Sequence, residues 1–131
     1  MHSPTVFNFF EPDYTAPGRI TDAGLKSPEF EITTETTVVT IANYLNTAIY
    51  GSLGPASDRI TLNLSNEQTL AANPTQLVDH LNSSLMANNM SAAMRNILIN
   101  AITQIPSNNL AERAKTAIYL VINSPEFTID K

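Results

Sequence analysis

The feature that most constrains this chain is a set of apolar stripes repeated at helical spacing. In four segments the apolar side chains recur every three or four residues, which is the period of one face of an α-helix. Asn73-Pro74, Ser91 and Asn109 precede three of these segments and are residues typical of helix starts. The pattern predicts helices at residues 34–50, 74–87, 91–105 and 109–123.

Helix stops separate these segments and set the fold class. Gly51, Pro106 and Pro125 follow three of the stripes, and glycine or proline at such positions ends a helix. Connections of about four residues between the last three helices imply antiparallel neighbours. We therefore predict an all-α fold, a small bundle of about four helices. Ile118 and Val121 lie on the widest apolar face, so we expect both in the core.

The amino-acid composition excludes several other classes of protein and several kinds of site. Charged residues make up only 15% of the 131 residues, which argues against a coiled coil or a charged disordered chain. There is no cysteine, so disulfides and thiolate metal sites are excluded. No apolar run approaches the ~18 residues of a membrane span.

An extended arm rich in proline and aromatic residues precedes the predicted bundle. Residues 1–32 contain four of the eight prolines, yet they also contain Phe7, Phe9, Phe10 and Tyr14. A disordered tail rarely carries so many aromatic rings, so we expect these four residues to form an interaction surface. The rings either fold back over the bundle or mediate self-association. We expect the arm (1–32) and the bundle (33–131) to form one domain.

The negative charge is concentrated toward the N-terminus. Residues 1–58 carry seven acids and two bases and so account for the whole net charge of −5. No basic patch is present that would follow a phosphate backbone, so nucleic acid is not expected as a partner. Solvation of a loop-rich surface is the simplest explanation of the acids.

The residues form no recognisable catalytic constellation. The two histidines, His2 and His80, have no histidine partner at metal-binding spacing, and neither a Gly-x-Ser-x-Gly turn nor a glycine-rich phosphate loop occurs. The spacing of the acids fits no calcium-binding loop. We therefore predict no catalytic, cofactor-binding or metal-binding residues in this chain.

One short sequence occurs twice. Ser27-Pro28-Glu29-Phe30 is repeated as Ser124-Pro125-Glu126-Phe127, about a hundred residues later. Turn chemistry explains the Ser-Pro pair. We interpret both copies as a Ser/Pro turn whose phenylalanine anchors it to the core.

Several strings together resemble a known family. They are Ser3-Pro4-Thr5-Val6-Phe7-Asn8-Phe9-Phe10, Pro17-Gly18, the two Ser-Pro-Glu-Phe copies and Ala117-Ile118-Tyr119-Leu120-Val121-Ile122. With these strings, nearly the whole chain resembles the C-terminal part of the uncharacterised bacterial family called domain of unknown function 1800.

The resemblance implies a longer, helical protein that is exported to the periplasm or beyond and is encoded beside a second family that resembles sulfatases. This chain starts where the family's C-terminal region starts, so we expect it to be a truncated or C-terminal piece, and its first residues do not resemble a signal peptide.

Two functional hypotheses remain. The first is a non-catalytic helical C-terminal module with a packing or protein-interaction role. Its partner would be the upstream part of its own protein or a protein encoded nearby. The second is a part of an enzyme or carbohydrate-processing factor whose site lies mostly in the upstream sequence.

Overall fold

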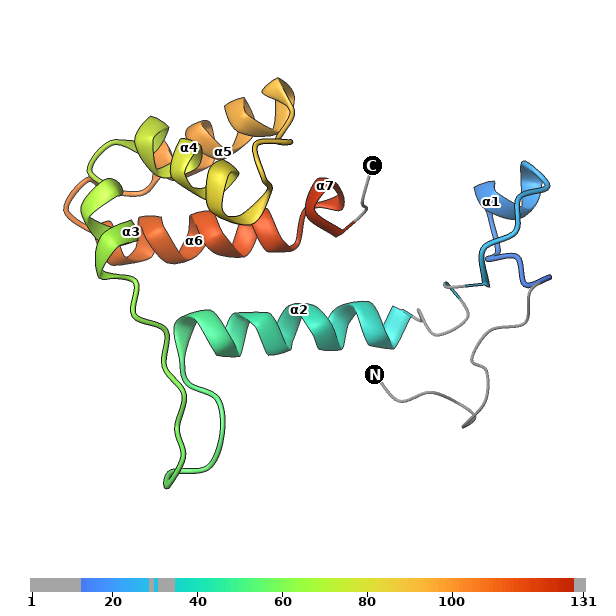
Figure 1. The fold of residues 1–131 in the computed structure, drawn as a ribbon, viewed down its shortest axis with the longest axis horizontal. Coiled ribbons are helices and arrows are strands. Elements are labelled where there is room, and N and C mark those ends of the chain that lie inside the picture. The colour runs from blue at the N-terminus through green and yellow to red at the C-terminus, as the bar shows by residue number, and fades with distance from the viewer. Residues whose placement is uncertain (1–12, 29, 31–34, 129–131) are drawn as a thin grey trace. The chain divides into compact units, whose positions relative to one another are not determined.

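The computed structural model describes residues 13–28, 30 and 35–128 (Figure 1). The described part of the chain consists of helices joined by turns and loops: α1 (Arg19–Asp22), α2 (Glu35–Tyr50), α3 (Ser65–Leu70), α4 (Pro74–Leu85), α5 (Ala92–Gln104), α6 (Leu110–Ile122) and α7 (Pro125–Thr128). The prediction of an all-α fold with four main helices is confirmed, and these four helices are α2, α4, α5 and α6.

The chain divides into two compact units, which we describe separately. The N-terminal unit comprises Met1–Asn43, and the C-terminal unit comprises Tyr44–Lys131. The C-terminal unit contains the last turns of α2 and all of α3 to α7. The predicted division into residues 1–32 and 33–131 stays a prediction.

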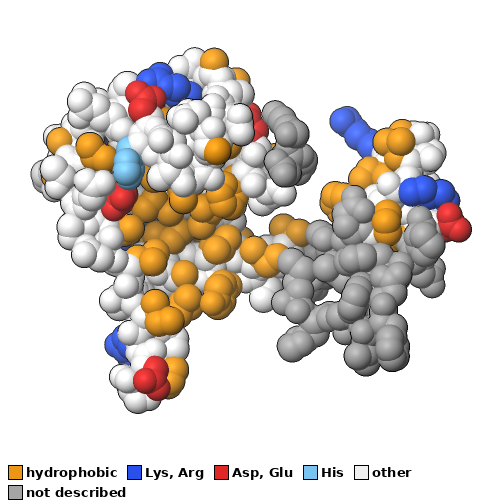
Figure 2. All heavy atoms as spheres, in the orientation of Figure 1, with side chains coloured by type: hydrophobic (Ala, Val, Ile, Leu, Met, Phe, Trp, Pro, Cys, Tyr) orange, Lys and Arg blue, Asp and Glu red, His pale blue; other side chains and the backbone are white. Residues whose placement is uncertain are grey.

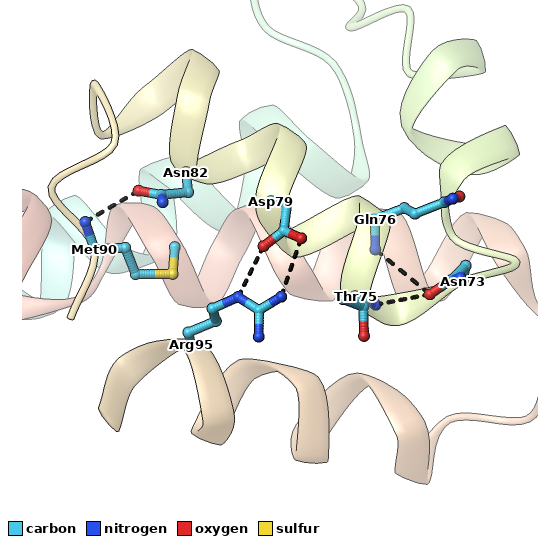
Figure 3. Close-up of polar contacts among 7 residues, drawn as sticks. All are labelled: Asn73, Thr75, Gln76, Asp79, Asn82, Met90 and Arg95. Carbon is cyan, nitrogen blue, oxygen red and sulfur yellow. Dashed lines mark hydrogen bonds and ion pairs between the residues drawn. The ribbon is translucent and has the colours of Figure 1, made fainter. Parts of the chain in front are cut away.

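Side-chain caps explain where the helices of the C-terminal unit begin. The Asn73 side chain accepts a hydrogen bond from Thr75 N, at 3.1 Å, at the start of α4 (Figure 3). Ser91 Oγ accepts from Met94 N, at 3.1 Å, at the start of α5. The Asn109 side chain does the same at the start of α6. Each cap satisfies a backbone donor that the helix leaves unpaired, so the three predicted starts follow from local chemistry.

The turn after α4 ends that helix two residues before the predicted end. Ala87 and Asn88 have positive φ angles of 48° and 66°, which a continuing right-handed helix does not allow. Asn82 closes this turn, because its side-chain oxygen accepts a hydrogen bond from Met90 N at 3.0 Å (Figure 3). The chain then enters α5 within a few residues.

The core of the C-terminal unit lies between α3, α4, α5 and α6. Its buried side chains come from all four helices or from the turns beside them: Ala71, Leu77, Val78, Leu81, Met86, Met94, Leu98, Ile102, Ala114, Ala117 and Val121. Burial of each large aliphatic side chain contributes roughly 1.5–3 kcal/mol. Helix α6 packs against α3, α4, α5 and α7 and is therefore the central element.

The last long helix places its predicted core residues differently. Val121 is fully buried, as predicted, whereas Ile118 is half-buried at the edge of the core. Alanine at positions 114 and 117 lets the neighbouring helices approach α6 closely.

In the N-terminal unit, Ser27 ties together the loop around α1. Ser27 N donates to the Tyr14 carbonyl at 2.8 Å, and Ser27 Oγ accepts from Ala16 N at 2.9 Å. The Ser27 side chain is buried by these contacts. Tyr14 is therefore held through its backbone in a closed loop, with its side chain half-buried.

Both Ser-Pro-Glu-Phe copies form a turn, but their phenylalanines do not anchor it. Phe30 N donates to the Ser27 carbonyl, and Phe127 N donates to Ser124, so the predicted turns are present. However, Phe30 and Phe127 keep 38% and 40% of their surface exposed. Because both rings are this exposed, the interpretation of them as core anchors is wrong. Hydrogen bonds of the serine close the two turns instead.

The loop between α2 and α3 contains Ile60, Leu62 and Leu64 alternating with polar residues, a pattern typical of a strand. Within the described residues, Ile60 makes an isolated antiparallel bridge with Leu53, with N–H···O distances of 2.8 and 2.9 Å. The bridge closes the loop between α2 and α3.

Candidate functional site

An apolar groove lies between α5, the end of α6 and α7. It encloses about 350 Å³, within the range of typical ligand and peptide pockets. Its lining is mostly aliphatic: Ala93, Met94, Ile97, Leu98, Leu120, Ser124, Pro125 and Glu126. Met94 and Leu98 belong to the core, whereas Ile97 keeps 66% of its surface exposed. Ile97 therefore lies on the solvent-exposed side of the groove.

One end of the groove is built by a long-range helix cap. Glu126 Oε2 accepts from Ser91 N at 2.9 Å, and Glu126 Oε1 accepts from Ser91 Oγ at 2.6 Å. In a capping box, an acidic residue three positions after the cap binds the cap's own N–H. That position is Met94 here, and Glu126 of α7 supplies the missing carboxylate from 35 residues away. This bond attaches α7 to the start of α5.

The stretch of sequence that contains α5 carries little charge, and Glu126 is the one charged residue of the groove lining. Residues 81–111 contain a single charged side chain, Arg95. Its guanidinium donates two hydrogen bonds to Asp79, at 2.8 and 3.0 Å (Figure 3). These bonds hold the pKa of the Asp79 carboxyl below its usual range. The pair is neutral overall, so α5 adds no net charge beside the groove.

A buried arginine fixes the opposite end of α5. Arg113 Nε and Nη2 donate to the Ile105 carbonyl at 2.9 and 2.8 Å, and Nη1 donates to the Ala71 carbonyl at 3.2 Å. These two carbonyls lie at the C-terminal ends of α5 and α3, where the helix dipole favours a positive charge. Arg113 is thus a shared cap for two helices.

A polar cluster joins the end of α2 to α6 within the C-terminal unit. The Tyr50 hydroxyl donates to Glu112 Oε1 at 3.1 Å and lies 3.0 Å from Thr116 Oγ1. Burial raises the pKa of Tyr50, and Glu112 raises it further, whereas the hydrogen bond with Thr116 lowers it. Lys115 Nζ lies 5.4 Å from the centre of the Tyr50 ring. These groups satisfy one another and so hold the two helices together.

The histidine of α4 also makes a structural contact. His80 Nε2 lies 3.2 Å from Glu67 Oε1, which links α4 to α3. Among residues 13–28, 30 and 35–128, no three histidine or acidic side chains are grouped closely enough to hold a metal ion.

The predicted interaction residues are only partly described. Phe7, Phe9 and Phe10 lie outside the described residues. Tyr14 belongs to the loop around α1 in the N-terminal unit, and the structure does not test it as an interaction residue.

The groove was not predicted from the sequence. Ile97 belongs to the apolar stripe of residues 91–105, and a residue of such a stripe is expected to face the core. The stripe is real, but Ile97 lies on its outer edge, where no other described helix covers it. The absence of charge from residues 81–111, apart from Arg95, is the signal that would have indicated an exposed apolar surface.

Hydrophobic side chains are also exposed elsewhere on the C-terminal unit. Figure 2 shows them gathered across the middle of its near face, in the part of the view where α6 runs. No helix in the described part of the chain is both long and apolar enough to cross a membrane.

These features define a small helical domain with an apolar groove on its surface. The chain belongs to the family described as "Protein of unknown function (DUF1800)", whose model matches residues 1–129. The search of curated proteins and the search of solved structures each found no match.

Proposed function

We propose that this chain is a non-catalytic helical module of an exported bacterial protein, and that its role is to pack against an apolar segment of a protein partner. The observation that carries the proposal is the groove of about 350 Å³ lined by aliphatic side chains of α5, α6 and α7. Such a groove suits an apolar segment better than a charged or sugar-like ligand, because it offers few polar partners.

The immediate surroundings support the same role. The polar contacts beside the groove are internal: Glu126 binds Ser91, and Arg95 binds Asp79. They stabilise the walls of the groove, in whose lining Glu126 is the one charged residue. Depletion of charge is typical of the central part of a protein interface. The family resemblance supports export and a bacterial origin.

A hydrophobic dye tests whether the groove binds apolar groups. Anilinonaphthalene sulfonate added to dilute protein should fluoresce, and Ile97→Asp should remove most of that signal because it places a charge on the rim. Ile60→Asp is the matched control, since Ile60 is 64% exposed and does not line the groove. Circular dichroism of both variants verifies that they are folded. Equal dye binding by Ile97→Asp and the wild-type chain would contradict the proposal.

A further inference from the structure

The first half of α2, residues 36–43, carries an apolar face that stays exposed. Val38 and Ile41 keep 55% and 39% of their surface exposed, and no residue of the range 36–43 is buried. By helical spacing these two side chains share a face with Ile49, which is buried near the end of the same helix. The apolar face of α2 is therefore covered at its C-terminal end and open over its first half.

Charge is absent both from this face and from the aromatic segment, residues 3–10. Residues 36–57 contain no acidic or basic side chain, and residues 3–10 contain none either. The seven acids of residues 1–58 all lie outside these two stretches. The two stretches can therefore meet without removing a charge from water, and depletion of charge is typical of the central part of an interface.

The loop around α1 brings the aromatic segment within reach of α2. The N–H of Ser27 donates to the Tyr14 carbonyl at 2.8 Å, so the two ends of this loop lie side by side. Phe10 precedes Tyr14 by four positions, and Glu35 follows Ser27 by eight. The path across the closed loop thus amounts to about 12 residues, which can span up to about 40 Å. The first half of α2 is only about 12 Å long.

The spacing of the rings matches the spacing of the helix face. Phe7 and Phe9 alternate with a polar residue, and in an extended segment two such rings lie on one side, about 7 Å apart. Val38 and Ile41 are one turn apart, which puts about 5–6 Å between their Cβ atoms. One ring can therefore lie over each aliphatic side chain. Residues 3–10 and 36–43 also belong to the same compact unit, Met1–Asn43.

We propose that the exposed face of α2 is the docking site of this chain's own aromatic segment, with Phe7 and Phe9 over Val38 and Ile41. A segment tethered to its site by a short linker is present there at an effective concentration in the millimolar range. A second copy must instead overcome the repulsion between two chains that each carry a net charge of −5. The inference is independent of the groove between α5, α6 and α7, and it leaves that groove to the partner of the proposed function.

Paramagnetic broadening in NMR spectra of the full chain tests the proposal. The chain has no cysteine, so a nitroxide label can be attached to a single introduced one. Thr40→Cys places the label on an exposed polar position of the first half of α2, within the helix width of about 10 Å from the apolar face. The ring signals of Phe7, Phe9 and Phe10 should then lose most of their intensity. The same label on Ile97→Cys, at the groove, should leave these signals nearly unchanged.

Charge substitutions locate the contact more closely. In the chain labelled at position 40, Ile41→Asp should restore the ring signals, because it places a charge under the rings. Ile60→Asp is the matched control, since Ile60 is 64% exposed and lies outside α2, and it should restore nothing. Circular dichroism verifies that both variants keep their helices. Should Ile41→Asp lose helix, the double variant Phe7→Ser, Phe9→Ser replaces it, and the ring signal of Phe10 should recover.

Three results would overturn the proposal. Ring signals that keep their intensity in the chain labelled at position 40 would show that the segment does not cover α2. Stronger broadening from the label at position 97 would place the segment in the groove. The third result uses a mixture of nitroxide-labelled chains and isotope-labelled chains without nitroxide. Equal broadening in this mixture would show that the segment docks on a second copy.

Discussion

At the scale of single residues, Arg113 shows how a buried charge can be stabilised by backbone carbonyls. Only 6% of its surface is exposed, and its guanidinium donates to the carbonyls of Ile105 and Ala71. These groups end α5 and α3, so one side chain satisfies acceptors of two helices. Lysine cannot replace it, because an ammonium group lacks the planar fork that reaches two separate acceptors.

We expect Arg113→Met to lower the free energy of unfolding by about 2–5 kcal/mol, because the buried carbonyls lose charged donors while the aliphatic bulk is kept. Urea denaturation measures the change. Arg95→Met is the matched control, since the Arg95–Asp79 pair is on the surface. Its midpoint should stay close to that of the wild-type chain. A midpoint equally unaffected in Arg113→Met would show that Arg113 does not cap these helices.

At the scale of elements, the bond between Ser91 and Glu126 joins a four-residue helix to the start of a long one. Helix α7 is too short to be stable alone. Its position depends on Glu126, whose carboxylate binds both the N–H and the hydroxyl of Ser91. This bond also fixes Pro125 and Glu126 in the groove lining.

A double-mutant cycle between Ser91→Ala and Glu126→Ala should give a coupling energy of about 1–3 kcal/mol, since both changes remove the hydrogen bond between the Ser91 hydroxyl and the Glu126 carboxylate. The bond from the backbone N–H of residue 91 is lost only in Glu126→Ala. Thermal or urea unfolding of the four proteins measures it. Ser91→Ala combined with Glu112→Ala serves as the comparison, because Glu112 pairs with Tyr50 instead. Additive effects in the Ser91–Glu126 cycle would contradict a long-range cap.

At the scale of the whole molecule, every buried residue of the hydrophobic core cluster belongs to the C-terminal unit. A fragment of residues 44–131 should therefore unfold in urea as one cooperative transition with a helical circular dichroism spectrum. A fragment of residues 1–43 should show no such transition. A gradual, non-cooperative transition of the longer fragment would show that the core needs the N-terminal unit.

The same measurement bears on the aromatic arm. If the rings of Phe7, Phe9 and Phe10 fold back over the bundle, which is one of the two alternatives that the sequence leaves open, the fragment of residues 44–131 should be less stable than the full chain. Burial of aromatic rings stabilises by about 25 cal/mol for each Å² of apolar surface removed from water. Equal midpoints would identify the arm as a free segment.

The amino-acid sequence by itself determined the fold class and the starts of the helices. Asn73, Ser91 and Asn109 cap their helices through hydrogen bonds to residues two or three positions ahead. The apolar stripes and the helix stops that follow them predicted the first and last residues of the four main helices to within two residues. These features depend on interactions between near neighbours, which is why a sequence pattern records them.

Only the tertiary structure decided which apolar residues the core covers and which distant groups meet. Ile97 shares its stripe with buried Leu98 and yet stays exposed, because coverage depends on where neighbouring helices end. Glu126 reaches Ser91 across 35 residues, and Arg113 reaches Ala71 across 42. The turn that contains Phe127 could be predicted from the sequence, but the side chain of Phe127 remains 40% exposed and does not anchor the turn to the core. Local propensities carry no information on such contacts, since the contacts exist only after the helices pack.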